Sequence, residues 1–597
     1  MGSNTERFLK TAVKQHLNGN QNAAIDLYNK VLSENPDNVT ALVNYSTILM
    51  DLKHFIDATY LLERALHISP EDIEARNNYG NTLFELGNPK KAIQQLKIAQ
   101  KLSPENSTVS INLARALLRQ GDYTGAIKIL ESAILYNPSN AELRFINALA
   151  LPIIPDSLKQ LRESRNRQIT LIRDLLRNDL LISDPIEKIG MTNFISAYHG
   201  LNDRELQNQL ATSFRSACSE LNYVAPHIGQ KNNKKKIRVG FVSANFCSHT
   251  IGKLNRALIS NLNRNKFEVF IFCLGTNKRN QNHLVDNYNS NVDNVIFLDP
   301  KLNAMHHDIA EKELDIIYYT DVGMEPLSYF LSFSRLASAQ CVTWGHPVST
   351  GVSTIDYFIS SKITEPKSSI TNYTEKLILF NCFSTDYATP NIERLSRSRK
   401  DFMLSETANL YFCPQSLFKF HPDFDQIIGD ILRGDPNGEL ILLEGQHPEW
   451  SVKLRKRFKE RIPDVSIRIK FFPRLSGSDF FHFISLANVI LDTPYFCGGN
   501  TSYEAFCLGK IIITLPGRYL RGRLTSGLYR QMGISTFIAK NQREYIQLAI
   551  KFGIDREAQK LAEKRIRVAN KAIFDTGSAI KAHEKFFLQI AALNSAN

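Results

Sequence analysis

A 34-residue period in the first quarter of the sequence constrains the fold more than any other feature. A period of 34 residues, with two helices per unit, is typical of a tetratricopeptide repeat. Each unit buries its apolar stripe only against its neighbours, so residues 1–150 are expected to form a curved α-solenoid with a concave binding surface. The residues that recur at this interval are Pro36, Pro70, Pro104 and Pro138, together with Ala24, Ala58, Ala92 and Ala126.

A set of asparagines keeps the same interval. Asn44, Asn78 and Asn112 each fall in the first helix of a unit, and this position lines the inner groove of such a superhelix. A carboxamide both donates and accepts hydrogen bonds, so a ladder of asparagines could bind the backbone of a protein or peptide of any sequence. The alternative is that these asparagines hold neighbouring repeats together. The ladder would stop at Ile146.

Composition limits the classes of partner and compartment. A formal net charge of +13 fits a nucleotide phosphate, a nucleic acid or an acidic protein surface, but no nucleic-acid-binding motif is present. The eight cysteines form no C-x-x-C pair and no metal-ligand spacing, which predicts reduced thiols in a cytoplasmic protein. No apolar run approaches the roughly 20 residues of a membrane span, so we expect neither secretion nor membrane insertion.

The remainder of the chain predicts an α/β fold after a helical connection. Residues 151–236 have helical patterns without the period and end in the basic run "GQKNNKKK", which we interpret as a solvated lead-in. From Ile237 onward, apolar strands alternate with helices, which predicts two Rossmann-like domains with parallel sheets, at 237–400 and 401–597. Ligands bind at the carboxyl ends of parallel strands, so we expect a site in the cleft between the two domains.

The stretch "DTPYFCGGNTSYEAFCLG", residues 492–509, joins a strand to a helix through a glycine-rich turn. Such a junction directs free backbone N–H groups and the positive end of the helix dipole at one point, where a phosphate is stabilised. The alternative is an ordinary loop between a strand and a helix.

Polar side chains that follow other predicted strands extend this candidate site. A lysine and a helix N-terminus can neutralise a diphosphate, and a carboxylate can bind ribose hydroxyls. No D-x-D motif follows a strand, so the pattern predicts a nucleotide-diphosphate site without a divalent metal. Each residue also has a structural alternative: a helix-capping or structural histidine, a solvated lysine, or a glutamate that favours the first turn of its helix. The candidates are His249, Asp321, His346, Gln415, Lys419 and Glu504.

These motifs together resemble the O-linked N-acetylglucosamine transferase and SPINDLY family, and its bacterial branch most. The resemblance covers nearly the whole chain and includes "RVGFVSANFCSHTIG", "NLYFCPQSLFKFHP" and "NVILDTPYFCGGNTSYEAFCLG". It implies a GT-B fold and an inverting, metal-independent enzyme that transfers a sugar from a nucleotide-sugar onto Ser or Thr of a protein. It favours UDP-N-acetylglucosamine as the donor and implies no cofactor.

The resemblance also assigns roles to individual residues. His249 and Lys419 match the family's active-site histidine and its diphosphate-binding lysine. Leu475 and Asn500 match positions around the nucleotide-sugar, and Thr501 and Ser502 match a pair of hydroxyls at the diphosphate. Gln415 and Gly499 are further nucleotide-sugar candidates from their places after strands, and Asp321 and His346 are candidate acceptor or sugar contacts. The ribose role of Glu504 is by analogy with other GT-B enzymes.

Three alternatives stay open at this point. Relatives also use UDP-glucose or GDP-fucose, and this sequence departs from the family near the base, where Phe483 falls close to the place of a uridine-stacking arginine. Related adhesin glycosyltransferases transfer glucose to Asn. The repeats could instead belong to an inactive scaffold, or bring two copies of the chain together.

Overall fold

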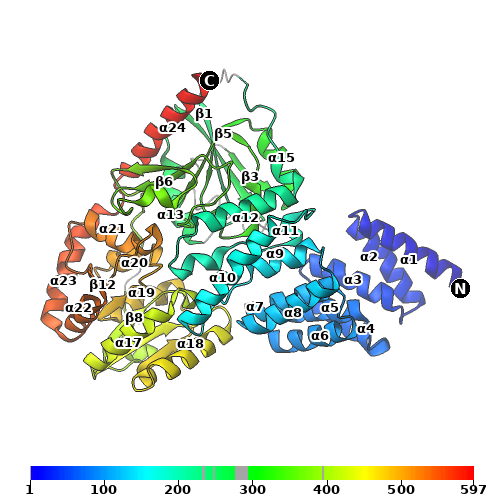
Figure 1. Cartoon of the computed structure of the whole chain (residues 1–597), viewed down its shortest axis with the longest axis horizontal. Helices are drawn as coiled ribbons and strands as arrows, with labels where there is room; N and C mark the ends of the chain where they lie inside the picture. The colour runs from blue at the N-terminus through cyan, green and yellow to red at the C-terminus, as the bar shows by residue number, and fades with distance from the viewer. Residues whose placement is uncertain (1, 231–234, 247–248, 276–293, 393–394, 597) are drawn as a thin grey trace. The chain divides into compact units, whose positions relative to one another are not determined.

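The computed structural model describes residues 2–230, 235–246, 249–275, 294–392 and 395–596. Part of the basic run near residue 231 and Cys247 therefore lie outside the described residues. The chain forms two compact units, residues 1–153 and 154–597, and each is described by itself below (Figure 1).

The first unit is an array of helices that pack in consecutive pairs, as the period predicts. The predicted helix at Pro89–Leu102 is confirmed at both ends, and the four periodic alanines are almost completely buried between helices. The helices are α1 (Gly2–Leu17), α2 (Gln21–Glu34), α3 (Val39–Asp51), α4 (Phe55–Ile68), α5 (Ile73–Glu85), α6 (Pro89–Leu102), α7 (Ser107–Arg119), α8 (Tyr123–Tyr136) and α9 (Ala141–Leu149).

The start of each first helix carries a periodic signal of its own. Asn38, Asp72, Asn106 and Asn140 are the N-cap residues of α3, α5, α7 and α9, and each side chain accepts a hydrogen bond from the backbone N–H three residues later. An N-cap of this kind satisfies a donor that would otherwise lack a partner and stabilises a helix by about 1 kcal/mol. The repeat is therefore encoded by helix starts as well as by the buried alanines.

The second unit contains two parallel sheets, as predicted. The strands of the first sheet are in the order β3-β2-β1-β4-β5-β6-β7. The order reverses at β1, so the carboxyl ends of β1 and β4 form a switch point where ligands bind. The apolar runs at 237–243, 267–273, 294–298, 314–319, 338–343 and 355–360 predict strands, and each of these strands is present, whereas β7 was not predicted. The strands are β1 (Ile237–Ser243), β2 (Phe267–Leu274), β3 (Asn294–Leu298), β4 (Leu314–Tyr319), β5 (Ala337–Thr343), β6 (Tyr357–Ser361) and β7 (Lys376–Phe380).

The second sheet has the order β10-β9-β8-β11-β12, with its switch point between β8 and β11. Its central strand Asn409–Cys413 is buried along its whole length, which explains its continuous apolar sequence. The other strands are β9 (Gly438–Leu443), β10 (Ile469–Phe472), β11 (Val489–Leu491) and β12 (Ile512–Ile513).

Helices cover both sheets and connect their strands. Those that contribute residues to the candidate site are α13 (Thr250–Asn261), α18 (Pro448–Arg461), α19 (Gly477–Leu486), α20 (Asn500–Cys507) and α21 (Leu524–Gln531). The others are α15 (Leu302–Ala310), α16 (Pro326–Leu331), α17 (Pro422–Gly434), α22 (Gln542–Ile554), α23 (Arg556–Ala569) and α24 (Ser578–Ala596). Although α24 ends the chain, its Phe586 and Phe587 pack into the core of the first sheet, beside which it runs in Figure 1.

The segment between the repeats and β1 belongs to the second unit. It includes α10 (Leu158–Leu175), a 3-10 helix at Phe194–His199 and α12 (Arg204–Ala217). The buried carboxylate of Asp203 pairs with Arg165 of α10 and, at 3.0 Å, with Arg521 of the second sheet domain. A buried charge is tolerated only when it is paired, so these contacts fix the segment against the α/β part.

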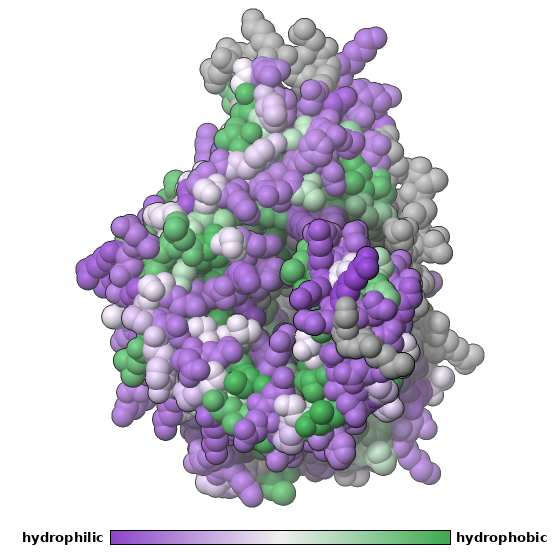
Figure 2. All heavy atoms as spheres, turned by 90° about the vertical axis from the view of Figure 1, so that its right-hand side faces the viewer, coloured by the Kyte–Doolittle hydropathy of each residue, from purple (hydrophilic) through white to green (hydrophobic). Residues whose placement is uncertain are grey.

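Among the described residues, no helix is long and apolar enough to cross a membrane. The face drawn in Figure 2 is mainly hydrophilic, with hydrophobic residues in separate small groups.

Candidate active site

Two adjoining cavities lie where the carboxyl ends of the two sheets face each other. The first has a volume of about 280 Å³ and is lined from both domains, by His249 and His346 of the first and Lys419 and Thr501 of the second. The second has a volume of about 450 Å³ and extends toward Leu475. The two cavities share Thr250, Pro414, Gln415, Ser416, Phe418, Asn500 and Thr501. The cleft predicted between the domains is thus present.

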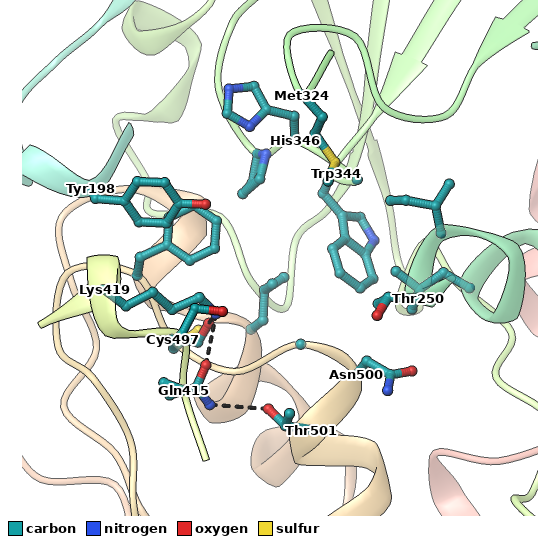
Figure 3. A pocket seen from close by; sticks show the side chains of 18 of the residues that line it. Tyr198, Thr250, Met324, Trp344, His346, Gln415, Lys419, Cys497, Asn500 and Thr501 are labelled. Atoms are coloured by element: carbon teal, nitrogen blue, oxygen red, sulfur yellow. Dashed lines mark hydrogen bonds between the residues drawn. The ribbon is translucent and has the colours of Figure 1, made fainter. Parts of the chain in front are cut away.

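Lys419 reaches the glycine-rich turn through two hydrogen bonds. Its Nζ donates to Gln415 Oε1 at 2.7 Å and to the carbonyl of Cys497 at 3.2 Å. Gln415 Nε2 in turn donates to Thr501 Oγ1 at 3.0 Å, a chain of contacts visible in Figure 3. The ammonium group of Lys419 lies over the ring of Phe496, 4.8 Å from the centroid of that ring. Burial lowers the pKa of Lys419 below its ordinary value.

The glycine-rich turn is tightly packed behind these contacts. Gly499 is the N-cap residue of α20 and offers no side-chain cap. The N–H of Ser502 donates to the carbonyl of Gly499 at 3.1 Å, whereas the N–H groups of Asn500 and Thr501, two residues that line the cavity, have no partner among the described residues. A Cβ on Gly498 would lie 2.8 Å from Thr501 Oγ1 and 2.9 Å from Gln415 Nε2, and closer still to Ser502 Oγ, which gives the first glycine of the pair a steric cause.

Ser502 is placed behind the turn. It is buried, and its hydroxyl shares a hydrogen bond with Thr525 at 2.9 Å. It does not line either cavity, so its contribution to the site is packing of the loop. The predicted pair of hydroxyls at the diphosphate is therefore reduced to Thr501, because Ser502 lies one position further along the helix and points inward.

His249 both lies at the cavity and caps a helix, the two positions that the sequence left open for it. It lines the first cavity and is also the N-cap residue of α13, where its Nδ1 accepts a hydrogen bond from the N–H of Ile251 at 3.3 Å. Desolvation lowers its pKa below the ordinary value, so the ring is neutral near pH 7. With Nδ1 accepting, the single proton of the neutral ring is assigned to Nε2, which can donate to a ligand.

His346 lies in the cavity wall, and Asp321 lies behind it. His346 is buried, stacks on Phe194 with ring centroids 5.4 Å apart, and its Nε2 has no partner among the described residues. Burial lowers its pKa to about 3, so this ring is also neutral. Asp321 is completely buried and does not line the cavity; it accepts hydrogen bonds from Ser243 at 2.8 Å and Asn245 at 2.7 Å, and so holds the loop after β1.

Glu504 lines the second cavity but is already paired. Its Oε1 lies 3.0 Å from Nζ of Lys253 on α13, so this contact joins the two domains across the site. Glu504 is buried, whereas 54% of the Lys253 side chain is exposed. An ion pair with one exposed partner contributes little, about 0 to 1 kcal/mol, so the pair leaves Glu504 available to a ligand.

We expect Glu504→Gln to raise the Kd of a nucleoside diphosphate about 10-fold, because one hydrogen bond to a charged acceptor contributes roughly 1.5 kcal/mol. Isothermal titration calorimetry measures this effect. Lys253→Gln is the matched control, since it breaks the ion pair and keeps the carboxylate, and it should change Kd by less than about 3-fold. Equal losses in the two variants would mean that Glu504 acts only through Lys253.

Aromatic and basic side chains line the far end of the second cavity. Leu475 lies there, together with Arg474, Trp450 and Phe480. Phe483, which falls near the place of the uridine-stacking arginine in the sequence comparison, is instead a core residue that packs on Phe402 and Phe412. The rings that line the cavity here are thus those of Trp450 and Phe480.

Several lining residues were missed because they are apolar or come from a distant segment. Phe194 and Tyr198 belong to the 3-10 helix before the α/β part, and Trp344 follows β5. Tyr198 packs between Phe418 and Phe496, with centroid separations of 4.8 and 4.5 Å. The paired aromatics in "FISAY" were an available signal, but nothing in the sequence placed them beside Lys419.

In the first unit, the periodic asparagines are half-buried and partly bonded to their neighbours. Asn78 Nδ2 donates to Thr47 Oγ1 at 3.2 Å, and Asn112 Nδ2 donates to Asn77 Oδ1 at 2.9 Å. These contacts join successive repeats, as expected if the asparagines hold neighbouring repeats together. Each carboxamide keeps hydrogen-bonding capacity beyond them, and peptide binding by the ladder stays a prediction.

Within the residues that the structure describes, no three His, Cys, Asp or Glu side chains cluster as a metal-binding group. The ammonium of Lys419 contacts the turn at the carbonyl of Cys497, at 3.2 Å.

Two Rossmann-like domains that face a shared cavity, with a lysine and a helix N-terminus on one side, define the GT-B class of glycosyltransferase folds. A model of glycosyl transferase family 41 matches residues 216–388 and 384–581, and a tetratricopeptide repeat model matches residues 49–101 and 85–150. The chain belongs to glycosyl transferase family 41.

Comparison with individual proteins agrees with this family. The probable UDP-N-acetylglucosamine-peptide N-acetylglucosaminyltransferase SEC of Arabidopsis thaliana is 25% identical over 373 residues, 60% of this chain and 37% of that protein. The SPINDLY protein of the same plant, with the same probable activity in its name, is 24% identical over 342 residues, 54% of this chain and 36% of that protein. The chain thus spans little more than a third of the length of these relatives.

A solved structure shares the fold over almost the whole chain. A mutant O-GlcNAc transferase of Thermobaculum terrenum superimposes with a TM-score of 0.71 at 20% identity, covering 94% of this chain and 98% of that one. This similarity confirms the predicted combination of a repeat solenoid with a GT-B fold.

Proposed function

We propose that the protein is an inverting, metal-independent glycosyltransferase that moves a sugar from a nucleotide-sugar onto Ser or Thr of a polypeptide. The donor we propose is UDP-N-acetylglucosamine, the sugar nucleotide in the names of the curated relatives. The observation that carries the proposal is the convergence of Lys419, Gln415 and Thr501 with the N-terminus of α20 at one end of a cavity.

In the proposed reaction, the acceptor hydroxyl attacks the anomeric carbon directly and the nucleoside diphosphate departs. The bond between the anomeric carbon and the β-phosphate oxygen breaks as the new glycosidic bond forms, and negative charge develops on the departing phosphate. Lys419 and the first amides of α20 face this charge, and preorganised donors of this kind can each contribute about 10²- to 10³-fold to the rate. No metal ion is needed for this step.

His249 fits the role of an orienting donor in this scheme. Its Nδ1 is occupied by the helix cap, so its free Nε2 carries the proton of the neutral ring and donates to an oxygen of the donor or acceptor. A general base would need the opposite tautomer. We therefore propose that His249 positions the substrates and that the hydroxyl proton passes to an oxygen of the departing diphosphate or to water.

The apolar wall gives the cavity a second property that suits a sugar. Tyr198, Trp344 and Phe496 line the cavity. In Figure 3, Tyr198 lies beside Lys419 and Trp344 lies on the opposite side. Aromatic faces pack well on the C–H faces of a pyranose and exclude water from the reacting atoms. The repeats of the first unit are the proposed holder of the acceptor polypeptide, in a reaction that we place in the cytoplasm.

The proposal is tested with purified protein, a panel of UDP- and GDP-sugars and an acceptor peptide pool, in buffer with excess EDTA. We expect UDP-N-acetylglucosamine to raise the melting temperature and to be turned over, and mass spectrometry to locate the sugar on a hydroxyl. Turnover of a GDP-sugar or UDP-glucose, or a sugar on an Asn amide, would replace the donor or acceptor in the proposal. Binding and turnover of no nucleotide-sugar would favour an inactive scaffold.

A further inference from the structure

One peptide unit of the glycine-rich turn is held from both sides by opposite charges. The carbonyl of Cys497 accepts a hydrogen bond from Lys419 Nζ at 3.2 Å, and the N–H of the next residue, Gly498, donates to Asp492 Oδ1 at 2.7 Å. The dipole of the peptide between them is thus aligned with its carbonyl toward the cation and its N–H toward the anion. Asp492, at the end of β11, is only 1% exposed.

We propose that Asp492 is a positioning residue for the transfer reaction, which fixes the Cys497–Gly498 peptide and supplies the negative charge that keeps Lys419 protonated beside the departing diphosphate. The inference rests on the proposed function, because it assigns a role at the same site. Asp492 does not line either cavity and touches no substrate position; it acts through the turn and through Lys419.

The surroundings leave this peptide little freedom to turn over. Cys497 N donates to the carbonyl of Arg521 at 2.8 Å, and Thr525 Oγ1 donates to the carbonyl of Gly498 at 3.3 Å. Asp492 Oδ2 is held in turn by Thr514 Oγ1 at 2.8 Å. If the peptide were flipped, its N–H would point at the ammonium group and its carbonyl at the carboxylate, and both contacts would be repulsive.

The titratable groups around Lys419 raise its pKa, in opposition to the effect of burial. Burial lowers the pKa of Lys419, and the groups that raise it again are Cys497, Asp492 and Cys413. The two thiols are themselves buried, and their pKa values are raised to about 12 for Cys497 and beyond that for Cys413, so both are neutral at physiological pH. Asp492 differs from the thiols in that both of its oxygens accept hydrogen bonds, from the N–H of Gly498 at 2.7 Å and from Thr514 Oγ1 at 2.8 Å, which is the bonding pattern of an ionised carboxylate.

The pKa of Asp492 is raised by burial and lowered by its hydrogen bonds with Gly498 and Thr514 and by Lys419. Two buried phenols, Tyr529 and Tyr545, also pack near it, and Tyr545 donates to its backbone carbonyl at 2.9 Å. Burial raises the pKa of both phenols well above the ordinary value, so neither carries charge. Lys419 binds a diphosphate as a cation, so diphosphate affinity is lost as pH rises through the pKa of Lys419. Without the charge of Asp492 the pKa of Lys419 is lower, so the affinity is lost at a lower pH.

The experiment compares Asp492→Asn with the unmodified chain by titrating UDP, GDP and the corresponding nucleosides from pH 6 to 10. An asparagine can still accept from the N–H of Gly498 and donate to Thr514, so this variant removes the charge and keeps the contacts. We expect its Kd for the bound diphosphate to rise about 10-fold at pH 8, with the alkaline loss of affinity shifted down by about one pH unit. Binding of the nucleoside, which lacks phosphate, should not change.

Three further variants make the test specific. Thr514→Val, which removes one hydrogen bond and leaves the charge, should keep the alkaline limit of the unmodified chain. In the Lys419→Gln background, Asp492→Asn should have no further effect on diphosphate affinity, because the partner of the charge is gone. Asp492→Ser is a smaller uncharged variant for the case in which the asparagine variant does not fold, with the same expected losses.

The outcomes distinguish failure of the proposed function from failure of the role of Asp492 alone. An unmodified chain that binds neither UDP nor GDP overturns the proposed function and this inference with it. An unmodified chain that binds a diphosphate, alongside a folded Asp492→Asn or Asp492→Ser variant with unchanged affinity and pH profile, overturns the inference alone. Equal losses for nucleoside and diphosphate also overturn it, because they indicate general damage to the domain.

Discussion

Lys419→Ala is expected to reduce turnover of the nucleotide-sugar by about 10²- to 10³-fold, because it removes a preorganised cation from the site where the diphosphate charge develops. The loss should appear in kcat more than in KM, since the charge on the departing phosphate is greatest in the transition state. Stability should change little. The ammonium group gains two hydrogen bonds in the folded chain, but it also loses hydration by its burial.

Release of UDP, followed with a coupled assay at saturating donor, measures this effect. Lys560→Ala is the control, since Lys560 is an exposed lysine of α23 that pairs with Glu557 at 2.8 Å. The control should retain full activity. Undiminished turnover by a folded Lys419→Ala protein would remove Lys419 from the mechanism and leave the helix N-terminus, with Gln415 and Thr501, to face the diphosphate.

Gly498→Ala is expected to abolish tight nucleotide binding through sterics alone. The new methyl group would enter the space of the Thr501 and Gln415 side chains, at 2.8 and 2.9 Å, and that of Ser502. The link from Lys419 through Gln415 to Thr501 would have to separate. We expect the Kd of the nucleoside diphosphate to rise by more than 10-fold, together with a fall of a few degrees in melting temperature, because overpacking costs about 1–3 kcal/mol.

Gly477→Ala is the matched control for this substitution. Gly477 is the first residue of α19, and a Cβ there would meet no atom within 4 Å. Calorimetric titration of both variants with UDP and GDP, alongside thermal unfolding, separates a local steric effect from a general effect of added methyl groups. Tight binding by Gly498→Ala would show that the turn does not need its present geometry.

The sequence predicted most of the fold because the signals were local and repeated. The 34-residue interval indicated the solenoid, since every unit must place the same small residue at the same helix contact. The continuous apolar run at Ile237–Ser243 and its successors indicated parallel sheets, because a strand buried on both faces has no polar side. Strand β7 was not predicted, although residues 377–380 are an apolar run; it lies at the edge of the sheet, and none of its residues before Phe380 is fully buried.

The sequence predicted where the candidate site lies more accurately than which side chains contact one another there. Lys419, Gln415, Thr501 and His249 meet at the cavity because each follows a strand end or begins a helix, which the sequence reveals. Asp321 and Ser502 have the same kind of position but point into the protein interior. Direction of a side chain depends on what packs against it, and those neighbours are far away in the chain.

By itself, the sequence determined the repeats, the two parallel sheets and the glycine-rich turn, because each follows from the spacing of residues along one short segment. Only the tertiary structure decided which groups surround the turn. It brought Phe194 and Tyr198 from an earlier helical segment, joined Lys253 to Glu504 across the domains, and set Asp492 and Lys419 on opposite sides of one peptide. These contacts depend on long-range packing, whose partners no local pattern specifies.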